Sequence, residues 1–562
     1  MARVGLEALT AGPASWRRRV VAGLALALAA GCGAPAAERS VVIAVSSDVG
    51  ILLPAAELTT LDAAIGNLLY LGLNSARWND GAIEYRADEM SLADSWTPES
   101  DSTVLVYHLK PDAVWSDGVP ITARDVVFSY ELIRAPGVAS RYASFWAELD
   151  SVVARGQHDV AFHFRRPHPR MLLHSGLSIM PAHIFEGTPA NTDALAGHRS
   201  LSAPDARPVV SGPFLVRERR PGERLVLEPN RRSVAGRPWL ERVVFRVQPD
   251  PATRVIALES GRVDVIDPVP LARAGELAAA PDIRVETTGL RYYEYIAWNG
   301  RRFAPFREPT VRRALSLAID RPGVLAGLGI EEFASPAAGP ATPLFPELID
   351  PAVRPDPFLP DSARALLRAA GWRDSDGDDV LDRDGVPFQF VLVTQADNER
   401  RRAAAEIIQA QLAAIGVATR LRALERNALL DLVYNRKDFE AALVGWGVTL
   451  EPDYLADQFW PADAQYNITG YRSVALDSLV PRARSARTDE EARPRWRAVG
   501  VQIARDRPYA FLWFYTEAVA LRERVQNVRI DVYGVYQNLH RWRLEPAAPA
   551  TTSRQTTGDG ER

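Results

Sequence analysis

The chain has 562 residues, of which 47% are hydrophobic and 24% charged, and its formal charge is −4. The length suits about three or four domains. The ordinary globular composition argues against a disordered, collagenous or coiled-coil chain. Only two of the 66 basic residues are lysines, which indicates the codon bias of a GC-rich genome. Acidic and basic residues are interspersed, so no basic face for nucleic acid is visible.

The first 31 residues are predicted to be a targeting segment. Three arginines at 17–19 precede an apolar run from Val20 to Ala30, which falls short of the roughly twenty residues needed to span a bilayer. Gly31 and then Cys32, the one cysteine of the chain, follow this run. A charged start, a short apolar stretch and small residues at the end predict a secretory signal peptide over residues 1–31.

The segment Leu28-Ala29-Ala30-Gly31-Cys32 resembles the cleavage box of bacterial lipoproteins, with its leucine one position further back than usual. The resemblance implies that Cys32 carries a lipid and that residues 32–39 are a tether. Each buried methylene of an acyl chain contributes about 0.8 kcal/mol to such anchoring. Removal of residues 1–31 takes away four arginines and one glutamate, so the mature protein has a charge of −7.

Strands and helices alternate irregularly along the body of the chain. Strands are predicted at 40–45, 103–109, 160–164, 214–216, 225–227 and 243–247, and helices begin at Thr122, Pro251 and Pro309. Eight prolines between Pro336 and Pro360 predict a long ordered loop or a crossing between domains. Beyond them, helices at 362–370, 398–415, 427–435, 474–484 and 490–505 accompany strands at 388–393, 417–421, 439–444 and 511–515.

One long block, from Trp115 to Ser129, carries a specific signature in which Asp117-Gly118 makes a tight turn and Thr122 caps a helix. Further blocks follow in a fixed order at 92–96, 211–214, 258–265, 298–299, 311–321, 370–378, 445–447 and 467–471. Together these blocks resemble the extracellular solute-binding proteins of peptide-type ABC importers, the dipeptide/oligopeptide-binding family (family five). The resemblance covers about residues 40–540.

The resemblance implies an α/β fold of the two-lobed, periplasmic-binding-protein-like kind (Venus flytrap, type II), with an extra domain inserted in the first lobe. Lobe I is expected to be discontinuous and to combine residues 40–75, 200–290 and 520–545. The inserted domain is expected at 76–199 and lobe II at 291–519, with a disordered tail at 546–562.

The resemblance also implies a solute site between the lobes. Trp446 matches the tryptophan of the family's Gly-Trp-x-x-Asp-Tyr motif, which lines the cleft. Thr449 stands where peptide binders have an aspartate for the ligand's amino terminus, and a hydroxyl cannot form that charge-assisted bond. Either Glu451 or Asp453 substitutes, or the ligand lacks a free amino terminus. Further candidates, for several of which core packing is the competing interpretation, are Tyr142, Trp298, Asn299, Tyr454 and Trp460.

An acidic segment resembles the spacing of a calcium loop. It contains Asp374, Asp376, Asp378 and Asp382, but Asp379 stands where such a loop needs glycine, and Gly385 where it needs glutamate. A solvated acidic turn is therefore favoured, and no metal or cofactor is expected. The eight histidines include no HExxH, and those at 163, 168 and 174 have no recognised ligand spacing.

These features predict a monomeric, lipid-anchored receptor at the periplasmic or extracellular face of a membrane. It captures oligopeptides or a similar small solute and delivers them to ABC permease subunits, with closure driven by contacts made only in the closed form. The absence of GxSxG, P-loop and HExxH motifs favours a protein that is not an enzyme. Alternatives are the same class binding an oligosaccharide, an opine-like compound or a metal chelate, a secreted hydrolase, and a signalling receptor.

Overall fold

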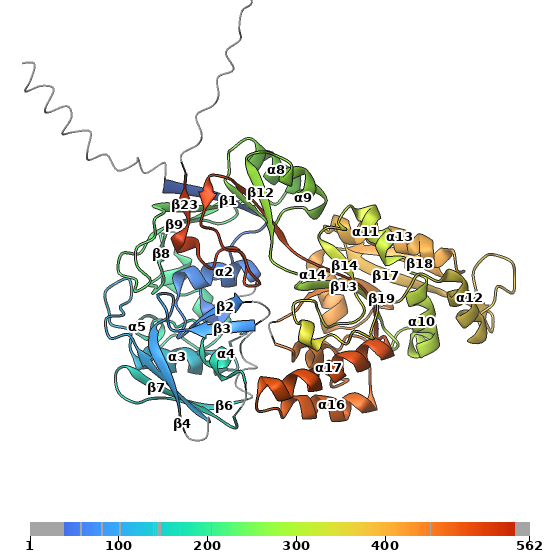
Figure 1. Cartoon of the computed structure of the whole chain (residues 1–562), viewed down its shortest axis with the longest axis horizontal. Coiled ribbons are helices and arrows are strands. Elements are labelled where there is room, and N and C mark those ends of the chain that lie inside the picture. The colour runs from blue at the N-terminus through green and yellow to red at the C-terminus, as the bar shows by residue number, and fades with distance from the viewer. Residues whose placement is uncertain are drawn as a thin grey trace, which may run out of the picture.

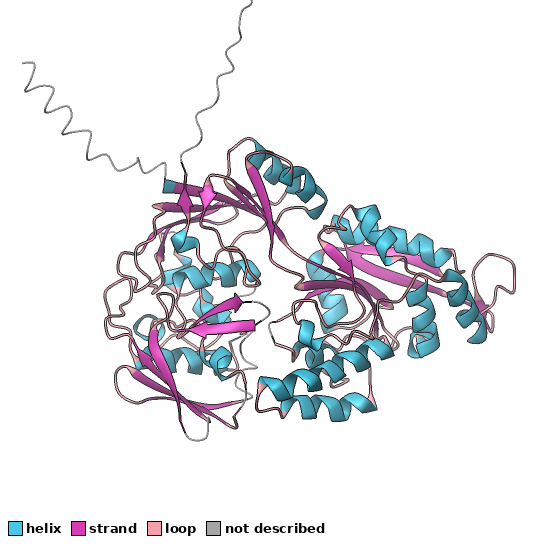
Figure 2. Ribbon diagram, viewed as in Figure 1, coloured by secondary structure: helices cyan, strands magenta, loops and turns pink. Residues whose placement is uncertain are grey.

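The computed structural model describes residues 39–545 except 57–58, 80–81, 100–102, 139, 141, 143–147, 168, 204 and 450. The predicted signal peptide, Cys32, nearly all of the tether and the predicted tail lie outside the described residues. Three large sheets organise the rest, and two of them belong to one side of the molecule in Figure 1, with the third on the other side. Figure 2 shows helices packed around all three.

We call the part built on the seven-stranded sheet lobe I. Its strand order is β12-β21-β11-β1-β10-β9-β8, and β1 (Ser40–Val45) lies parallel to both β10 (Arg242–Val247) and β11 (Val265–Asp267). Most residues of β1 are buried, as expected for a strand inside a sheet. The other elements are α2 (Thr60–Leu69), β8 (Phe214–Arg220), β9 (Arg224–Pro229), α8 (Pro251–Glu259), α9 (Leu271–Ala278), β12 (Ile283–Thr287) and β21 (Ala518–Arg522).

The inserted domain contains a four-stranded antiparallel sheet of order β4-β5-β7-β6. Its helix α3 (Ala123–Arg134) begins at Thr122 as predicted, and the carboxylate of Asp125 accepts a bond from the Thr122 backbone N–H at 2.9 Å. Tyr107 and Phe162 of this domain share one hydrophobic cluster with Val41 of lobe I. The other elements are β2 (Ser75–Asn79), β3 (Ala82–Arg86), β4 (Ala93–Glu99), β5 (Val104–Leu109), β6 (Leu149–Ala154), β7 (Asp159–Phe164), α4 (Met171–Ser175), α5 (Ala182–Phe185), α6 (Thr192–Ala196) and α7 (Arg199–Ser202).

Lobe II is built on a six-stranded sheet of order β14-β20-β13-β19-β17-β18, with a hydrophobic cluster on each face. Its strands are β13 (Tyr292–Trp298), β14 (Ala334–Pro336), β17 (Gln389–Gln395), β18 (Ala418–Leu424), β19 (Ala441–Gly447) and β20 (Tyr509–Tyr515). Its helices are α10 (Pro309–Leu317), α11 (Arg321–Leu328), α12 (Pro360–Ala369), α13 (Glu399–Ala413), α14 (Arg426–Leu430), α15 (Tyr454–Phe459), α16 (Val474–Arg484) and α17 (Asp489–Asp506). The predicted helix at 427–435 instead divides into α14 and one π-helical turn, η6 (Asp431–Asn435).

Two neighbouring segments connect the sheets of lobe I and lobe II, and we call them the hinge. Residues 288–291 lead from β12 to β13, and residues 516–517 lead from β20 to β21. The two segments are hydrogen-bonded to each other, since the Thr288 backbone N–H donates to the Glu517 carbonyl at 3.0 Å. The Tyr292 hydroxyl donates to the Glu517 carboxylate at 3.0 Å. Lobe I resumes at Ala518 in β21.

A carboxyl group of lobe I lies beside the hinge. Asp267 ends β11, and burial raises the pKa of its carboxyl to about 7, with Glu517 adding to the rise and Arg254 opposing it. Burial likewise raises the pKa of Glu517, which Tyr292, Arg291 and Arg400 oppose. Two carboxyl groups with raised pKa values therefore lie close together where the lobes join.

Lobe II contains a buried ion triad at the start of α13. The Glu294 side chain is 0% exposed and accepts bonds from Arg400 Nη2 at 3.0 Å and from Arg401 Nε at 2.9 Å. The guanidinium of Arg400 also lies 4.1 Å from the centroid of the Tyr515 ring. Both arginines occupy the first turn of α13, where the helix dipole disfavours positive charge, so Glu294 is needed to offset them.

Within the described part of the chain, no helix is long and apolar enough to cross a bilayer.

Glu294→Gln is expected to destabilise the protein by about 3 kcal/mol, because it leaves two guanidinium groups without their buried counter-charge. Urea unfolding measures the change. Glu276→Gln is the control, since Glu276 pairs with Arg273 while 61% exposed on α9, and it should leave stability unchanged. Equal midpoints for the two variants would contradict the role of the triad.

The Asp267 carboxyl is expected to make stability fall as pH rises. Its pKa is about 7 in the folded chain against an ordinary value of 3.8, so the folded state retains a proton that the unfolded state releases between these values. The free energy of unfolding therefore decreases from about pH 4 to about pH 7. Asp267→Asn stays neutral and should lose less stability between about pH 4 and about pH 7 in urea unfolding. Parallel pH profiles for variant and wild type would argue against this assignment.

Candidate functional site

The inserted domain and lobe II are in direct contact at two places. The ring of Trp78 on β2 meets the ring of Phe345 edge-on, with centroids 5.9 Å apart. Glu451, which follows β19, pairs with Arg170 and with His174 of α4. We call these five residues the interlobe contact. They place β2 against the segment at Phe345, and Arg170 and α4 against the loop after β19.

The Glu451 carboxylate forms the charged part of the interlobe contact. Its Oε2 lies 3.3 Å from Arg170 Nη1, and its Oε1 lies 3.3 Å from His174 Nε2. Tyr85 of β3 lies close by, and burial raises the pKa of its hydroxyl, with contributions from Tyr533 and Glu451 that Arg170 opposes. One carboxylate thus serves two basic side chains from the inserted domain.

An aromatic group on lobe II surrounds Trp446. Trp446 lies on β19, and its ring centroid is 5.1 Å from that of Tyr466 and 6.3 Å from that of Tyr434. Tyr466 is 37% exposed, and the Trp446 indole N–H has no hydrogen-bond partner among the described residues. Such a group offers stacking surface to a ligand. Sequence reasoning proposed Trp446 as a site residue but neither of the two tyrosines.

Thr449 is exposed, and its hydroxyl donates to the Glu451 carbonyl at 3.3 Å. The two acidic residues considered as substitutes for the family's aspartate are both paired. Glu451 binds the inserted domain, and Asp453 accepts two bonds from Arg484, at 2.9 and 3.0 Å. A ligand ammonium would therefore compete with arginines for either carboxylate.

Three of the predicted site residues lie inside lobe II rather than on its surface. Trp298 is 2% exposed and packs against Phe306. Asn299 is 0% exposed and donates to the Phe439 carbonyl at 2.7 Å. Tyr454 is also buried, with its hydroxyl bonded to the Pro340 carbonyl at 2.7 Å. Core packing, the competing interpretation, accounts for these side chains.

The remaining two predicted residues are partly exposed. Tyr142 packs against the small hydrophobic cluster of the inserted domain that contains Leu132 and Met180. Trp460 donates from its indole N–H to Asp477 at 2.8 Å, and the Arg484 guanidinium lies 5.5 Å from its ring centroid. These contacts lie within each residue's own body.

Sequence reasoning missed the basic residues of the interlobe contact and the triad at α13. Arg170 and His174 stand among other arginines and histidines without a recognisable spacing, so nothing in the sequence singled them out. Arg400 and Arg401 did carry a signal, since two arginines in a predicted first helical turn require a nearby carboxylate.

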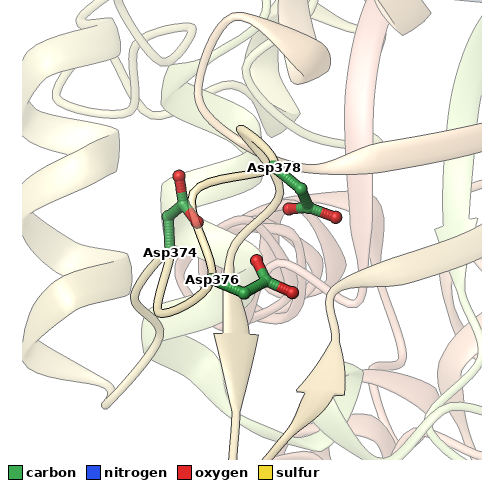
Figure 3. A group of neighbouring side chains, drawn as sticks. All are labelled: Asp374, Asp376 and Asp378. Atoms are coloured by element: carbon green, nitrogen blue, oxygen red, sulfur yellow. The ribbon is translucent and has the colours of Figure 1, made fainter.

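The acidic segment forms an exposed turn (Figure 3). Asp374, Asp376 and Asp378 each offer an oxygen within 4.8 Å of the others. Asp374 also accepts the Gly377 backbone N–H at 2.7 Å, while Asp382 accepts the Ser375 hydroxyl at 2.6 Å. The turn's own backbone and side chains thus use several of these carboxylates as acceptors.

Known proteins are similar to this chain in sequence and fold. The Oligopeptide-binding protein AppA of Bacillus subtilis is 27% identical over 463 residues, covering 81% of this chain and 83% of AppA. The Nickel-binding periplasmic protein of Escherichia coli is 23% identical over 406 residues, covering 68% of this chain and 73% of that protein. The solved structure of Bacillus subtilis AppA in complex with a nonapeptide superposes with a TM-score of 0.77 at 25% identity, covering 90% of this chain and 99% of AppA.

The blocks recognised in the sequence fall mostly within one family match. The model of the family described as bacterial extracellular solute-binding proteins, family 5 (Middle), matches residues 89–467. This range spans most of the inserted domain, part of lobe I and much of lobe II, including Trp446 and Glu451. The chain therefore belongs to the bacterial extracellular solute-binding proteins of family 5.

Proposed function

We propose that the protein captures oligopeptides or a similar small solute between its two lobes and delivers it to the permease of an ABC importer. The observation that carries the proposal is the two-segment hinge, which joins lobe I to a lobe II that also contacts the inserted domain. A body connected in this way can open and close as a unit, and a solute held by both sides favours the closed form. The name of the relative AppA supports oligopeptides as the first ligand class to test.

The aromatic group at Trp446 suits such ligands, because stacking tolerates different side chains. Glu451 and Asp453 are already paired with arginines, so the amino terminus of a peptide would have to compete for these carboxylates. Solutes without an amino terminus are therefore tested as well. A metal chelate is the second candidate, and the relative named as a nickel-binding protein favours its inclusion. Oligosaccharides and opine-like compounds complete the panel.

Release of the solute without chemical change is part of the proposal. Binding and delivery require only differential contacts in the open and closed forms. Recovery of intact ligand from the complex by mass spectrometry supports this role, and cleavage of the ligand would favour the hydrolase.

A thermal-shift screen with the four ligand classes should identify a stabilising solute, since ligand at 100 times its Kd adds about 2.7 kcal/mol. For that solute, Trp446→Ala should weaken binding roughly 30-fold, because the wall loses its central ring. Trp239→Ala is the matched control, as Trp239 is also partly buried but stacks with Arg39 in lobe I. Equal affinity for both variants, with intact folding, would remove Trp446 from the site.

We propose that Cys32 carries the lipid that holds the protein at the periplasmic or extracellular face of a membrane. Cys32→Ser should release the protein into the soluble fraction, because no acyl chain can then be attached. Cell fractionation with an immunoblot measures the distribution. The control is Ser46→Ala, which alters a residue beyond the tether and should leave the protein with the membranes. A Cys32→Ser protein that stays membrane-bound would count against lipid anchoring.

A further inference from the structure

The ion cluster at Glu451 joins two bodies that are far apart in the sequence. Glu451 and Arg170 are 281 residues apart, and Glu451 and His174 are 277 apart. We propose that Glu451 is a positioning residue that holds lobe II against the inserted domain when the cleft closes. The inference rests on the proposed capture of a solute between the lobes, and it assigns part of the closing free energy to the protein itself.

The cluster is sheltered enough for its charges to matter. The side chain of Glu451 is 15% exposed, that of Arg170 is 21% exposed and that of His174 is 8% exposed. Charges with so little contact with water are screened less by salt than those on an open surface. Removal of Glu451 takes from Arg170 and His174 the carboxylate that links them to lobe II.

The inserted domain holds its side of the cluster firmly. The Tyr130 hydroxyl of α3 donates to the His174 carbonyl at 3.1 Å. The next residue, Ser175, lies 3.0 Å from the Tyr107 hydroxyl of β5 through its own hydroxyl. Helix α4 is thus fixed to the sheet of its own domain and moves with it.

Lobe II and the hinge anchor the segment that carries Glu451. The backbone N–H of Val448 donates to the Arg291 carbonyl at 3.0 Å, and Arg291 Nε donates to the Val448 carbonyl at 3.0 Å. Thr449 then bonds to the Glu451 carbonyl. Since each partner is anchored in its own body, the ion pairs cannot follow a large separation of the lobes.

Contacts that exist in one of two states shift the equilibrium toward that state by their free energy. The Glu451 pairs belong to the closed arrangement, while hydration replaces them when the lobes separate. Their loss should therefore favour the open form without unfolding either body. A tenfold shift of the open–closed ratio corresponds to about 1.4 kcal/mol.

The test measures lobe separation in the absence of solute. Spin labels at Val153→Cys in β6 and Val474→Cys at the start of α16 lie on exposed sites, 45% and 88% exposed, in a full chain that also carries Cys32→Ser. Pulsed electron-spin distance measurements then give the populations of open and closed forms. Glu451→Gln and Arg170→Gln should each raise the open–closed ratio roughly tenfold.

Two further variants separate positioning from general destabilisation. Glu451→Arg combined with Arg170→Glu restores opposite charges and should return the ratio toward wild type. Asp356→Asn removes a carboxylate that is also 15% exposed but pairs with Arg507 inside lobe II, so it should leave the ratio unchanged.

Unchanged distances in Glu451→Gln, a charge-swapped chain as open as the single variants, or a wild type already as open as them would each overturn the proposal. Because no solute is present, these results do not depend on which ligand binds. Failure of the proposed function would instead appear as the absence of any stabilising solute in the thermal screen.

Discussion

The hinge is the constraint on which the rest of the molecule depends. Two short segments, 288–291 and 516–517, carry the chain between the sheets of lobe I and lobe II and bond to each other through Thr288 and Glu517. The inserted domain shares a hydrophobic cluster with lobe I, and part of lobe I, including Val255 and Leu258, shares another with lobe II. A solute between the inserted domain and lobe II would therefore be held by parts of the chain that the hinge and this packing connect.

Buried charge is concentrated near this hinge. Asp267 and Glu517 lie beside it with raised pKa values, and Arg400 connects the neighbourhood of Glu517 to the Glu294 triad of lobe II. Buried charges are costly unless they are paired, and paired charges tolerate little displacement. These ion pairs consequently fix the start of α13 and the first residues of β13 relative to β20, the strand that leads back to lobe I.

Arginine serves as a structural donor in this chain, beyond its role in ion pairs. Arg321 is 2% exposed and bonds to the carbonyls of Phe511 and Ser316. Arg312 bonds similarly to carbonyls of Phe306 and Asp506. A guanidinium has five N–H donors in one plane and can satisfy several carbonyls at once, which the ammonium of lysine cannot do in that geometry. The near absence of lysine, interpreted from composition as a codon bias, thus has structural consequences.

Local signals in the sequence predicted several helix starts and the family. Thr122, Asn398 and Pro309 mark where α3, α13 and α10 begin, since caps and proline act within one helical turn. The strand β13 was missed, because its aromatic run is buried on both faces and shows no alternation. The division of the helix at 427–435 was also invisible, as a π-helical turn has no distinct local pattern.

The candidate site also combines features that the sequence suggests with features that only the tertiary structure shows. Trp446 was identified from its motif, but Trp298, Asn299 and Tyr454 carry residue types that suit a ligand and a core equally, and only packing assigned them to the core. Glu451 was noted for its charge, while its partners Arg170 and His174 became apparent only when the inserted domain met lobe II. The sequence by itself determined the family and several helix caps, because these depend on neighbours along the chain. The tertiary structure decided burial and ion pairing, because these depend on residues almost three hundred positions apart.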